Sequence, residues 1–251
     1  MEKNRLFRWI FLLALISAFS MLSGCSGKAG SSSSAPPSSA PSGSTSSQEK
    51  EEDEQASESG TPVIDYQVLV NKNHSLPEGW EDAVDLVHIT NSLGNEISVE
   101  RSTYAAYLKL HDQLAREGID VDISSAWRSE AEQQEFADSA AKEYGEKDGK
   151  KHAALTGHSE HQTGLALDLY IKIDGKDIYR EKELMKYQEI WEEIHDQLAQ
   201  FGFILRYPEG SEEVTGYAYE PWHIRYVEEK AAREITEQEI TLEEYLDLDD
   251  L

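Results

Sequence analysis

Two histidines and one aspartate in the second half of the chain could together hold a metal ion. They are His161, Asp168 and His223, whose imidazole nitrogens and carboxylate oxygens are common zinc ligands. A catalytic zinc site has three protein ligands and one open position for water or substrate. Glu220, three residues before His223, could handle a proton beside such an ion. These residue types predict a zinc-dependent peptide hydrolase.

The spacing between His161 and Asp168 restricts how both residues can reach one ion. They are seven residues apart, and in one regular strand this odd offset would put them on opposite faces and about 23 Å apart. We therefore expect His161 to lie in a loop, with Gly164 allowing a turn before an extended segment. Asp168 then belongs to a strand that begins after this glycine.

Residue alternation predicts two strands, each with an apolar face and a face that carries a candidate ligand. In the first strand, Leu165, Leu167, Leu169 and Ile171 lie opposite Gly164, Ala166 and Asp168. In the second, Trp222, Ile224 and Tyr226 lie opposite His223 and Arg225, and Pro221 leaves Glu220 in the preceding turn. A single buried Asp or His is more often structural. The joint pattern on two strands favours a metal site.

Other polar residues near these segments have both structural and functional interpretations. Arg128 follows an expected strand and could form a surface ion pair or bind a carboxylate through two parallel hydrogen bonds. Ser129 has the spacing to Glu132 of a capping box, so we expect it to begin a helix. His158 is close enough to His161 to reach the site, and we expect it to support the site or to face the substrate rather than to be a fourth ligand. The other histidines have no partner spacing and are expected to be structural or exposed: His74, His88, His111, His152 and His195.

The elements that must position these residues mix strands and helices without a regular βαβ alternation. Strands are expected over residues 66–71 and 119–126, beside those around Asp168 and His223. Helices are expected from Tyr104 to a stop at Gly118, after Ser129 with Phe136 turned inward, and from Leu184 to a stop at Gly202. Thr236 and Thr241 open an acidic end that we expect to be short helix and solvated tail. The predicted fold class is α+β, with a small antiparallel sheet flanked by helices.

The N-terminal quarter of the chain predicts export and a membrane anchor. Residues 1–24 carry a basic start and a short apolar run, which is typical of a signal peptide. Leu22-Ser23-Gly24-Cys25 resembles a lipobox, so Cys25 is expected to be lipidated; an ordinary signal peptide with an incidental cysteine is the alternative. Residues 25–60 form a Ser-, Pro- and Glu-rich tether. Residues 61–251 are the expected catalytic domain with its acidic C-terminal end.

Charge and cysteine content narrow the possible partners. The formal net charge of −26 argues against nucleic acid and against electrostatic binding to anionic lipid, so membrane attachment would depend on acyl chains at Cys25. Cys25 is the only cysteine, so the metal ligands cannot be thiolates and no intrachain disulfide can form. We expect an extracytoplasmic monomer anchored to the cell membrane and facing the wall or periplasm.

Three blocks of sequence resemble the VanY-type D-alanyl-D-alanine carboxypeptidases, zinc peptidases with the hedgehog/DD-peptidase fold. The blocks are SAWRS with the following Gln133, GHSEHQTGLALD, and EPWHIR, within residues 62–235. The resemblance implies that His161, Asp168 and His223 bind one Zn²⁺ and that Glu220 is the catalytic acid and base. It also implies that Arg128, Gln133 and Ser159 contact the substrate. One position departs from the pattern, because Trp127 stands where the family usually has tyrosine.

The resemblance implies removal of the C-terminal D-alanine from peptidoglycan stem peptides, with Arg128 holding the terminal carboxylate. The bond cut could be the D,D-bond of a pentapeptide or the L,D-bond of a tetrapeptide, and the GHSEHQTGLALD block is slightly closer to the L,D-type. Two alternatives are a catalytically silent wall-binding lipoprotein and a zinc endopeptidase of wall cross-links. Glu220 beside intact ligands argues against the first, and the arginine clamp argues against the second.

Overall fold

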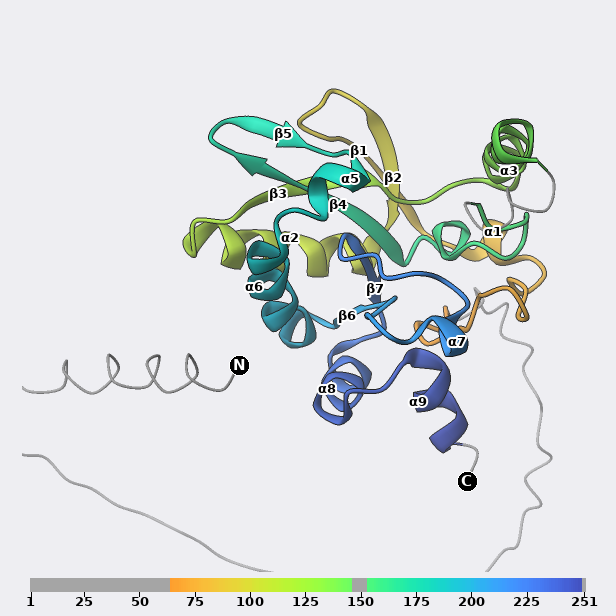
Figure 1. Cartoon of the computed structure of the whole chain (residues 1–251). Coiled ribbons are helices and arrows are strands. Elements are labelled where there is room, and N and C mark those ends of the chain that lie inside the picture. The colour runs from red at the N-terminus through yellow and green to blue at the C-terminus, as the bar shows by residue number, and fades with distance from the viewer. Residues whose placement is uncertain (1–63, 146–152, 250–251) are drawn as a thin grey trace, which may run out of the picture. The chain divides into compact units, whose positions relative to one another are not determined.

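The structure is a computed structural model that describes residues 64–145 and 153–249 (Figure 1). The predicted signal peptide, Cys25 and the tether lie outside these residues, as does His152. Across the described ranges, we find no helix with the length and apolar character needed to cross a membrane.

An antiparallel sheet forms the centre of the fold. Its strands run in the order β3 (Asp120–Ser125), β4 (Ala166–Ile173), β7 (His223–Tyr226) and β6 (Phe203–Leu205), and β5 (Lys176–Ile178) also pairs with β4. A separate hairpin consists of β1 (Leu86–Thr90) and β2 (Glu96–Glu100). In the main sheet, Asp168 of β4 pairs directly with His223 of β7. The register therefore places two predicted metal ligands side by side.

Two long helices cover one face of the sheet, as Figure 1 shows. They are α2 (Arg101–Arg116) and α6 (Gln188–Leu198), and their apolar residues share one core with the strands. Leu114 of α2, Ile123 of β3 and Trp191 of α6 are all fully buried in it. A second core joins β6 to α8 (Glu229–Gln238) and α9 (Leu242–Asp249). These packed layers confirm the predicted α+β class with a small antiparallel sheet.

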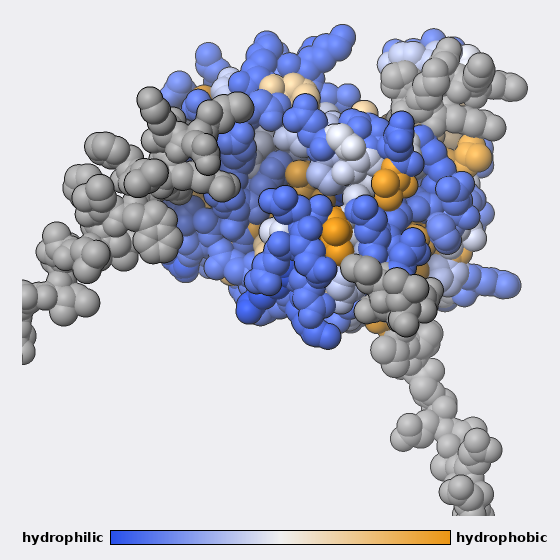
Figure 2. Space-filling view, turned by 60° about the horizontal axis from the view of Figure 1, so that its bottom comes forward, coloured by the Kyte–Doolittle hydropathy of each residue, from blue (hydrophilic) through white to orange (hydrophobic). Residues whose placement is uncertain are grey.

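The remaining elements are α3 and several short turns of helix. The longer one, α3, spans Glu130–Tyr144 and begins at the predicted capping box, in which Ser129 and Glu132 each bind the other's backbone amide. The short ones are α1 (Trp80–Ala83), α5 (Glu181–Leu184), α7 (Glu212–Thr215), η1 (Glu160–Thr163) and η2 (Ala199–Phe201). On the face drawn in Figure 2, hydrophilic side chains predominate and apolar ones form small patches between them.

The strand predicted over residues 66–71 is wrong. Val68 and Val70 are buried as the alternation indicated, but the segment begins with a turn and pairs with no strand among the described residues. The carbonyls of Tyr66 and Val68 instead accept hydrogen bonds from the Arg225 guanidinium, at 3.0 and 2.8 Å. A side chain from β7 therefore satisfies backbone groups that a neighbouring strand would otherwise bind.

Three further expectations about helices need correction. Phe136 is 48% exposed rather than turned inward, because its ring lies over the Arg128 guanidinium at 4.6 Å. The single helix expected from Leu184 is divided into α5 and α6, although Gly202 does end the segment with a left-handed backbone. Thr236 lies inside α8 and does not start a helix.

The acidic C-terminal end contains the expected short helix, α9, which packs onto the domain rather than lying free in solvent. Thr241 caps α9 and forms a capping box with Glu244, whose carboxylate accepts a hydrogen bond from the Thr241 amide at 2.8 Å. Leu242 is fully buried and Tyr245 is 7% exposed, both in the second core. The apolar residues between the acidic ones therefore determine the position of this helix.

Replacing Gly202 by alanine is expected to lower the free energy of unfolding by about 3 kcal/mol, combining the cost of a left-handed backbone with that of overpacking. Gly202 has a φ of +82°, and a Cβ there would lie 2.7 Å from Cε2 of Tyr226. Gly118→Ala is a matched control: the φ of Gly118 is +85°, but apart from its chain neighbours no described residue has an atom within 4 Å of the added Cβ. Urea denaturation should show a smaller loss for Gly118→Ala, of about 1 kcal/mol. Equal losses would contradict the packing argument.

Candidate metal centre

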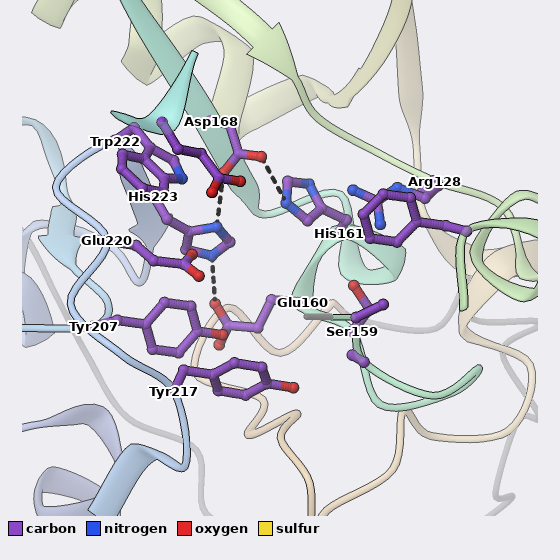
Figure 3. A pocket seen from close by; sticks show the side chains of 14 residues that line it. Arg128, Ser159, Glu160, His161, Asp168, Tyr207, Tyr217, Glu220, Trp222 and His223 are labelled. Carbon is purple, nitrogen blue, oxygen red and sulfur yellow. Dashed lines mark hydrogen bonds and ion pairs between the residues drawn. The ribbon is translucent and has the colours of Figure 1, made fainter. Parts of the chain in front are cut away.

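His161, Asp168 and His223 converge on one point at the edge of a cavity (Figure 3). They come from η1, β4 and β7, respectively. Nδ1 of His223 lies 2.9 Å from Oδ1 of Asp168, and Nε2 of His161 lies 3.2 Å from Oδ2. One ligand atom from each of the three side chains lies within 4.8 Å of the other two. The structure therefore brings the three predicted ligands together.

The geometry and donor types of this group fit a tetrahedral zinc ion. Ligand atoms bound to zinc at about 2.0–2.1 Å are about 3.3 Å apart at tetrahedral angles, close to the observed 2.9 and 3.2 Å. The Nδ1 of His161 lies 2.6 Å from the Ala126 carbonyl oxygen. Because that nitrogen donates its proton to the carbonyl, Nε2 keeps a lone pair for the metal. Three ligands leave a fourth position for the chemistry.

A tight turn between η1 and β4 lets both His161 and Asp168 reach this point. Gly164 ends η1 with a φ of +77°, as the sequence predicted. A Cβ there would lie 3.2 Å from both the Glu100 Cβ and the Val84 Cγ2, so the backbone also passes close to its neighbours. The positive φ and the close packing both favour glycine. His161 lies in a short 3₁₀ turn rather than an irregular loop.

The protonation of Asp168 and His223 makes metal binding at this site depend on pH. Burial acts to raise the pKa of Asp168, but His161 and His223 outweigh it and hold that pKa well below its usual range. Burial acts to lower the pKa of His223, but hydrogen bonds to Asp168 and Glu160 raise it to about 9. His223 thus holds a proton at neutral pH when no metal is bound. Metal binding must displace that proton, so the affinity of the site for a metal ion should decrease as pH falls.

Glu220 lies in the turn before β7, with its carboxylate beside the His223 ring (Figure 3). It lines the same cavity as the three ligands. Burial raises the pKa of Glu220, His223 acts in the opposite direction, and Asp168 and Glu181 add to the rise, which brings the pKa to about 7. A carboxyl group that titrates near neutral pH can both accept and return a proton.

Arg128 and Ser159 line the cavity together with the ligands, and Figure 3 shows Arg128 beyond His161 on the side away from Glu220. The Arg128 Nη1 donates to Oε1 of Gln133 at 2.7 Å, and the Gln133 amide donates to the Ala154 carbonyl at 2.7 Å. Gln133 is fully buried behind Arg128. In this structure Gln133 orients the guanidinium, while its predicted contact with substrate stays a prediction.

Several residues around the centre, most of them buried, were not predicted as parts of the site. Tyr207 packs against the His223 ring at 4.8 Å between centroids, and Tyr217 packs against Tyr207 at 4.8 Å. A charged group lies behind them and contains Glu160, Arg206, Arg225 and Glu243. Two signals were available in the sequence: Glu160 adjoins His161, and Arg225 shares the ligand face of its strand.

The remaining described histidines near the site have structural partners. His158 does not belong to the ligand group, and its Nδ1 lies 2.8 Å from the Asn71 carbonyl oxygen. His195 Nε2 lies 2.8 Å from the Pro221 carbonyl oxygen, so it supports the turn that carries Glu220. Both contacts agree with supporting roles.

Comparison with known proteins shows the family to which the chain belongs. The model of the VanY family, described as D-alanyl-D-alanine carboxypeptidase, matches residues 96–229. The Bacillus subtilis protein YodJ is 35% identical over 184 residues, which cover 71% of this chain and 66% of YodJ. The chain thus spans just under two thirds of the length of that relative.

Two solved structures share the fold. A VanY D,D-pentapeptidase from a VanB-type resistance cassette, in complex with Zn(II), has a TM-score of 0.61 and 30% identity, covering 72% of this chain and 98% of that one. The LdcB LD-carboxypeptidase, described in terms of peptidoglycan recognition, has a TM-score of 0.64 and 34% identity, covering 71% of this chain and 84% of that one. A solved structure that shares this fold, that of the VanY D,D-pentapeptidase, therefore contains zinc.

Proposed function

Because the chain belongs to the VanY family of D-alanyl-D-alanine carboxypeptidases, we propose that it is a zinc-dependent carboxypeptidase that removes the C-terminal D-alanine from peptidoglycan stem peptides. One observation carries the proposal: His161, Asp168 and His223 meet at the edge of a cavity that Glu220 and Arg128 also line. This cavity combines groups for metal binding, proton transfer and carboxylate recognition.

In the proposed reaction, different residues of the cavity bind the metal, transfer the proton and hold the substrate. When held by His161, Asp168 and His223, zinc supplies Lewis-acid polarisation of the scissile carbonyl and lowers the pKa of the attacking water. Glu220 accepts the proton of that water and returns it to the leaving amine, which its pKa of about 7 allows. Arg128 binds the terminal carboxylate and sets the scissile bond one residue from the chain end.

Mass spectrometry of purified stem peptides tests the proposed reaction. The zinc-loaded protein is incubated with a stem pentapeptide and, separately, with a stem tetrapeptide, and loss of one alanine is followed. LdcB is named for L,D-cleavage and VanY for D,D-cleavage, so either peptide is a reasonable substrate and the experiment determines which bond is preferred. No release of D-alanine from either peptide would contradict the proposal.

Arg128→Lys is expected to lower kcat/KM for a peptide with a free C-terminal carboxylate by about 10- to 100-fold. Lysine keeps the positive charge but cannot donate two parallel hydrogen bonds to a carboxylate. A peptide with a C-terminal carboxamide serves as the control, because wild type and variant should cleave it equally slowly. If the variant matched the wild type on the free acid, Arg128 would not bind the carboxylate.

The proposal extends to the placement of the enzyme in the cell. Residues 1–24 are the proposed signal peptide, and lipidated Cys25 with the tether through residue 60 would hold the domain outside the membrane as a monomer. The support is the sequence pattern around Cys25 and the Ser- and Pro-rich composition that follows it. Cys25→Ala should move the protein from the membrane fraction to the soluble fraction; an unchanged distribution would contradict the anchor.

A further inference from the structure

Glu160 is a fully buried carboxylate beside the metal centre, and the reaction described above does not use it. Its side chain is 0% exposed, and it directly precedes His161 on η1. Burying a charged carboxylate costs free energy unless the group is paired and hydrogen-bonded. The partners of Glu160 therefore indicate what it does.

Two buried guanidinium groups hold one oxygen of Glu160. Arg206 Nε donates to Oε1 at 2.7 Å, and Arg225 Nη1 donates to the same atom at 2.6 Å. Both arginine side chains are also 0% exposed. Charged donors form short, directional hydrogen bonds, so this pair restricts the orientation of the carboxylate. Its second oxygen, Oε2, is left for another partner.

That partner is a ligand of the metal centre. The Glu160 Oε2 lies 3.4 Å from Nε2 of His223, while Nδ1 of the same ring lies 2.9 Å from Asp168. A neutral imidazole has one N–H and one lone pair. When the N–H points to Glu160, the lone pair is on Nδ1, where the metal would lie. In the His161 ring the two nitrogens have the opposite roles. Its Nδ1–H points to the Ala126 carbonyl, so its lone pair is on Nε2.

The C-terminal helix completes the charged group. The Glu243 carboxylate on α9 accepts two hydrogen bonds from Arg206, at 2.9 and 2.7 Å, and one from the Asn71 amide at 3.1 Å. The group thus contains two negative charges, on Glu160 and Glu243, and two positive charges, on the two guanidinium groups. Because these charges balance, the free-energy cost of burying them is limited. Glu243 lies beyond residues 96–229, where the family model matches.

We propose that Glu160 is a positioning residue of the metal centre: it accepts the Nε2–H of His223 and so directs Nδ1 of that ring to the metal, while Arg206, Arg225 and Glu243 hold the carboxylate in place. The inference rests on the zinc site of the proposed function and is independent of the substrate. It also makes α9 a support of that site.

Zinc affinity measured by competition with a chelator tests this role without any substrate. In Glu160→Gln, the amide has only one acceptor oxygen, so it must leave either His223 or the two arginines without their acceptor. We expect the zinc Kd to rise about 10- to 100-fold. Circular dichroism identifies whether this variant folds. If the folded variant bound zinc within twofold of the wild-type Kd, the proposal would be wrong.

Glu243→Gln provides the second variant if Glu160→Gln does not fold. The Glu243 side chain is 11% exposed, and its loss should loosen Arg206 and raise the zinc Kd by about tenfold. Asp247→Asn is the matched control, since it removes the same charge from an exposed position of α9. Its Kd should equal that of the wild type. Equal affinity of Glu243→Gln and Asp247→Asn would then overturn the proposal.

The ring nitrogens of His223 can be observed directly in the zinc-loaded wild type by ¹⁵N NMR. The proposal predicts a protonated Nε2 and a metal-bound Nδ1, a distinction that a purely structural ion pair does not require. A metal-bound Nε2 would overturn it, and so would a wild type that binds no zinc, which would also remove the metal centre. Failure to cleave stem peptides with intact zinc binding would contradict only the proposed substrate and reaction.

Discussion

Glu220→Gln is expected to lower kcat on stem peptides by about 10³-fold or more while about one zinc stays bound per chain. Glutamine keeps the size of the side chain but cannot accept the proton of the attacking water, and general acid–base catalysis contributes about 10²- to 10⁴-fold. Glu220 does not belong to the ligand group, so the metal should remain. Metal analysis and single-turnover kinetics on the same sample measure both quantities.

A matched control for this variant is available in the same cavity. Glu181 also lines it, but this second glutamate is exposed on α5. Glu181→Gln should therefore leave kcat within a few-fold of the wild type. The role assigned to Glu220 would be wrong if Glu220→Gln kept wild-type kcat, or if its loss of activity followed a loss of zinc.

His223→Ala is expected to reduce zinc content from about one ion per chain to below about 0.1, and activity with it. The variant removes one of the three proposed protein ligands, and the two that remain cannot complete the three-ligand set of a catalytic site. Inductively coupled plasma mass spectrometry after dialysis against a weak chelator gives the stoichiometry.

His158→Ala is the control for this experiment. His158 lies three residues before His161 but does not belong to the ligand group. Its Nδ1 contacts the Asn71 carbonyl oxygen instead. The His158→Ala variant should therefore bind as much zinc as the wild type. If His223→Ala retained zinc at the wild-type level, His223 would have to be removed from the ligand set, and the arrangement with Asp168 would need another explanation.

Local sequence patterns predicted the parts of the site that depend on backbone geometry. The seven-residue offset between His161 and Asp168 required a turn, and Gly164 supplies it with a φ of +77°. Alternation placed Asp168 and His223 on the ligand faces of two strands, and the structure pairs them directly. The pairing itself was beyond these patterns, because residue parity determines which face a side chain takes but not which strand lies next to it.

The charged group behind the site could not be predicted because its members are distant in sequence. Glu160 of η1 and Arg225 of β7 are 65 residues apart and meet only when the chain is folded. The same arginine explains why the strand predicted over residues 66–71 does not form. Its guanidinium donates hydrogen bonds to backbone carbonyls that a partner strand would otherwise bind. An arginine in an apolar strand indicates a buried partner, but the sequence does not identify that partner.

Anomalous diffraction from crystals of the zinc-loaded protein, recorded at the zinc absorption edge, tests the metal centre most directly. The expected result is one strong peak per chain within about 2.0–2.2 Å of Nε2 of His161, a carboxylate oxygen of Asp168 and Nδ1 of His223. Glu220 should lie near the ion without binding it. A peak elsewhere in the domain, or no peak between these three side chains, would contradict the account.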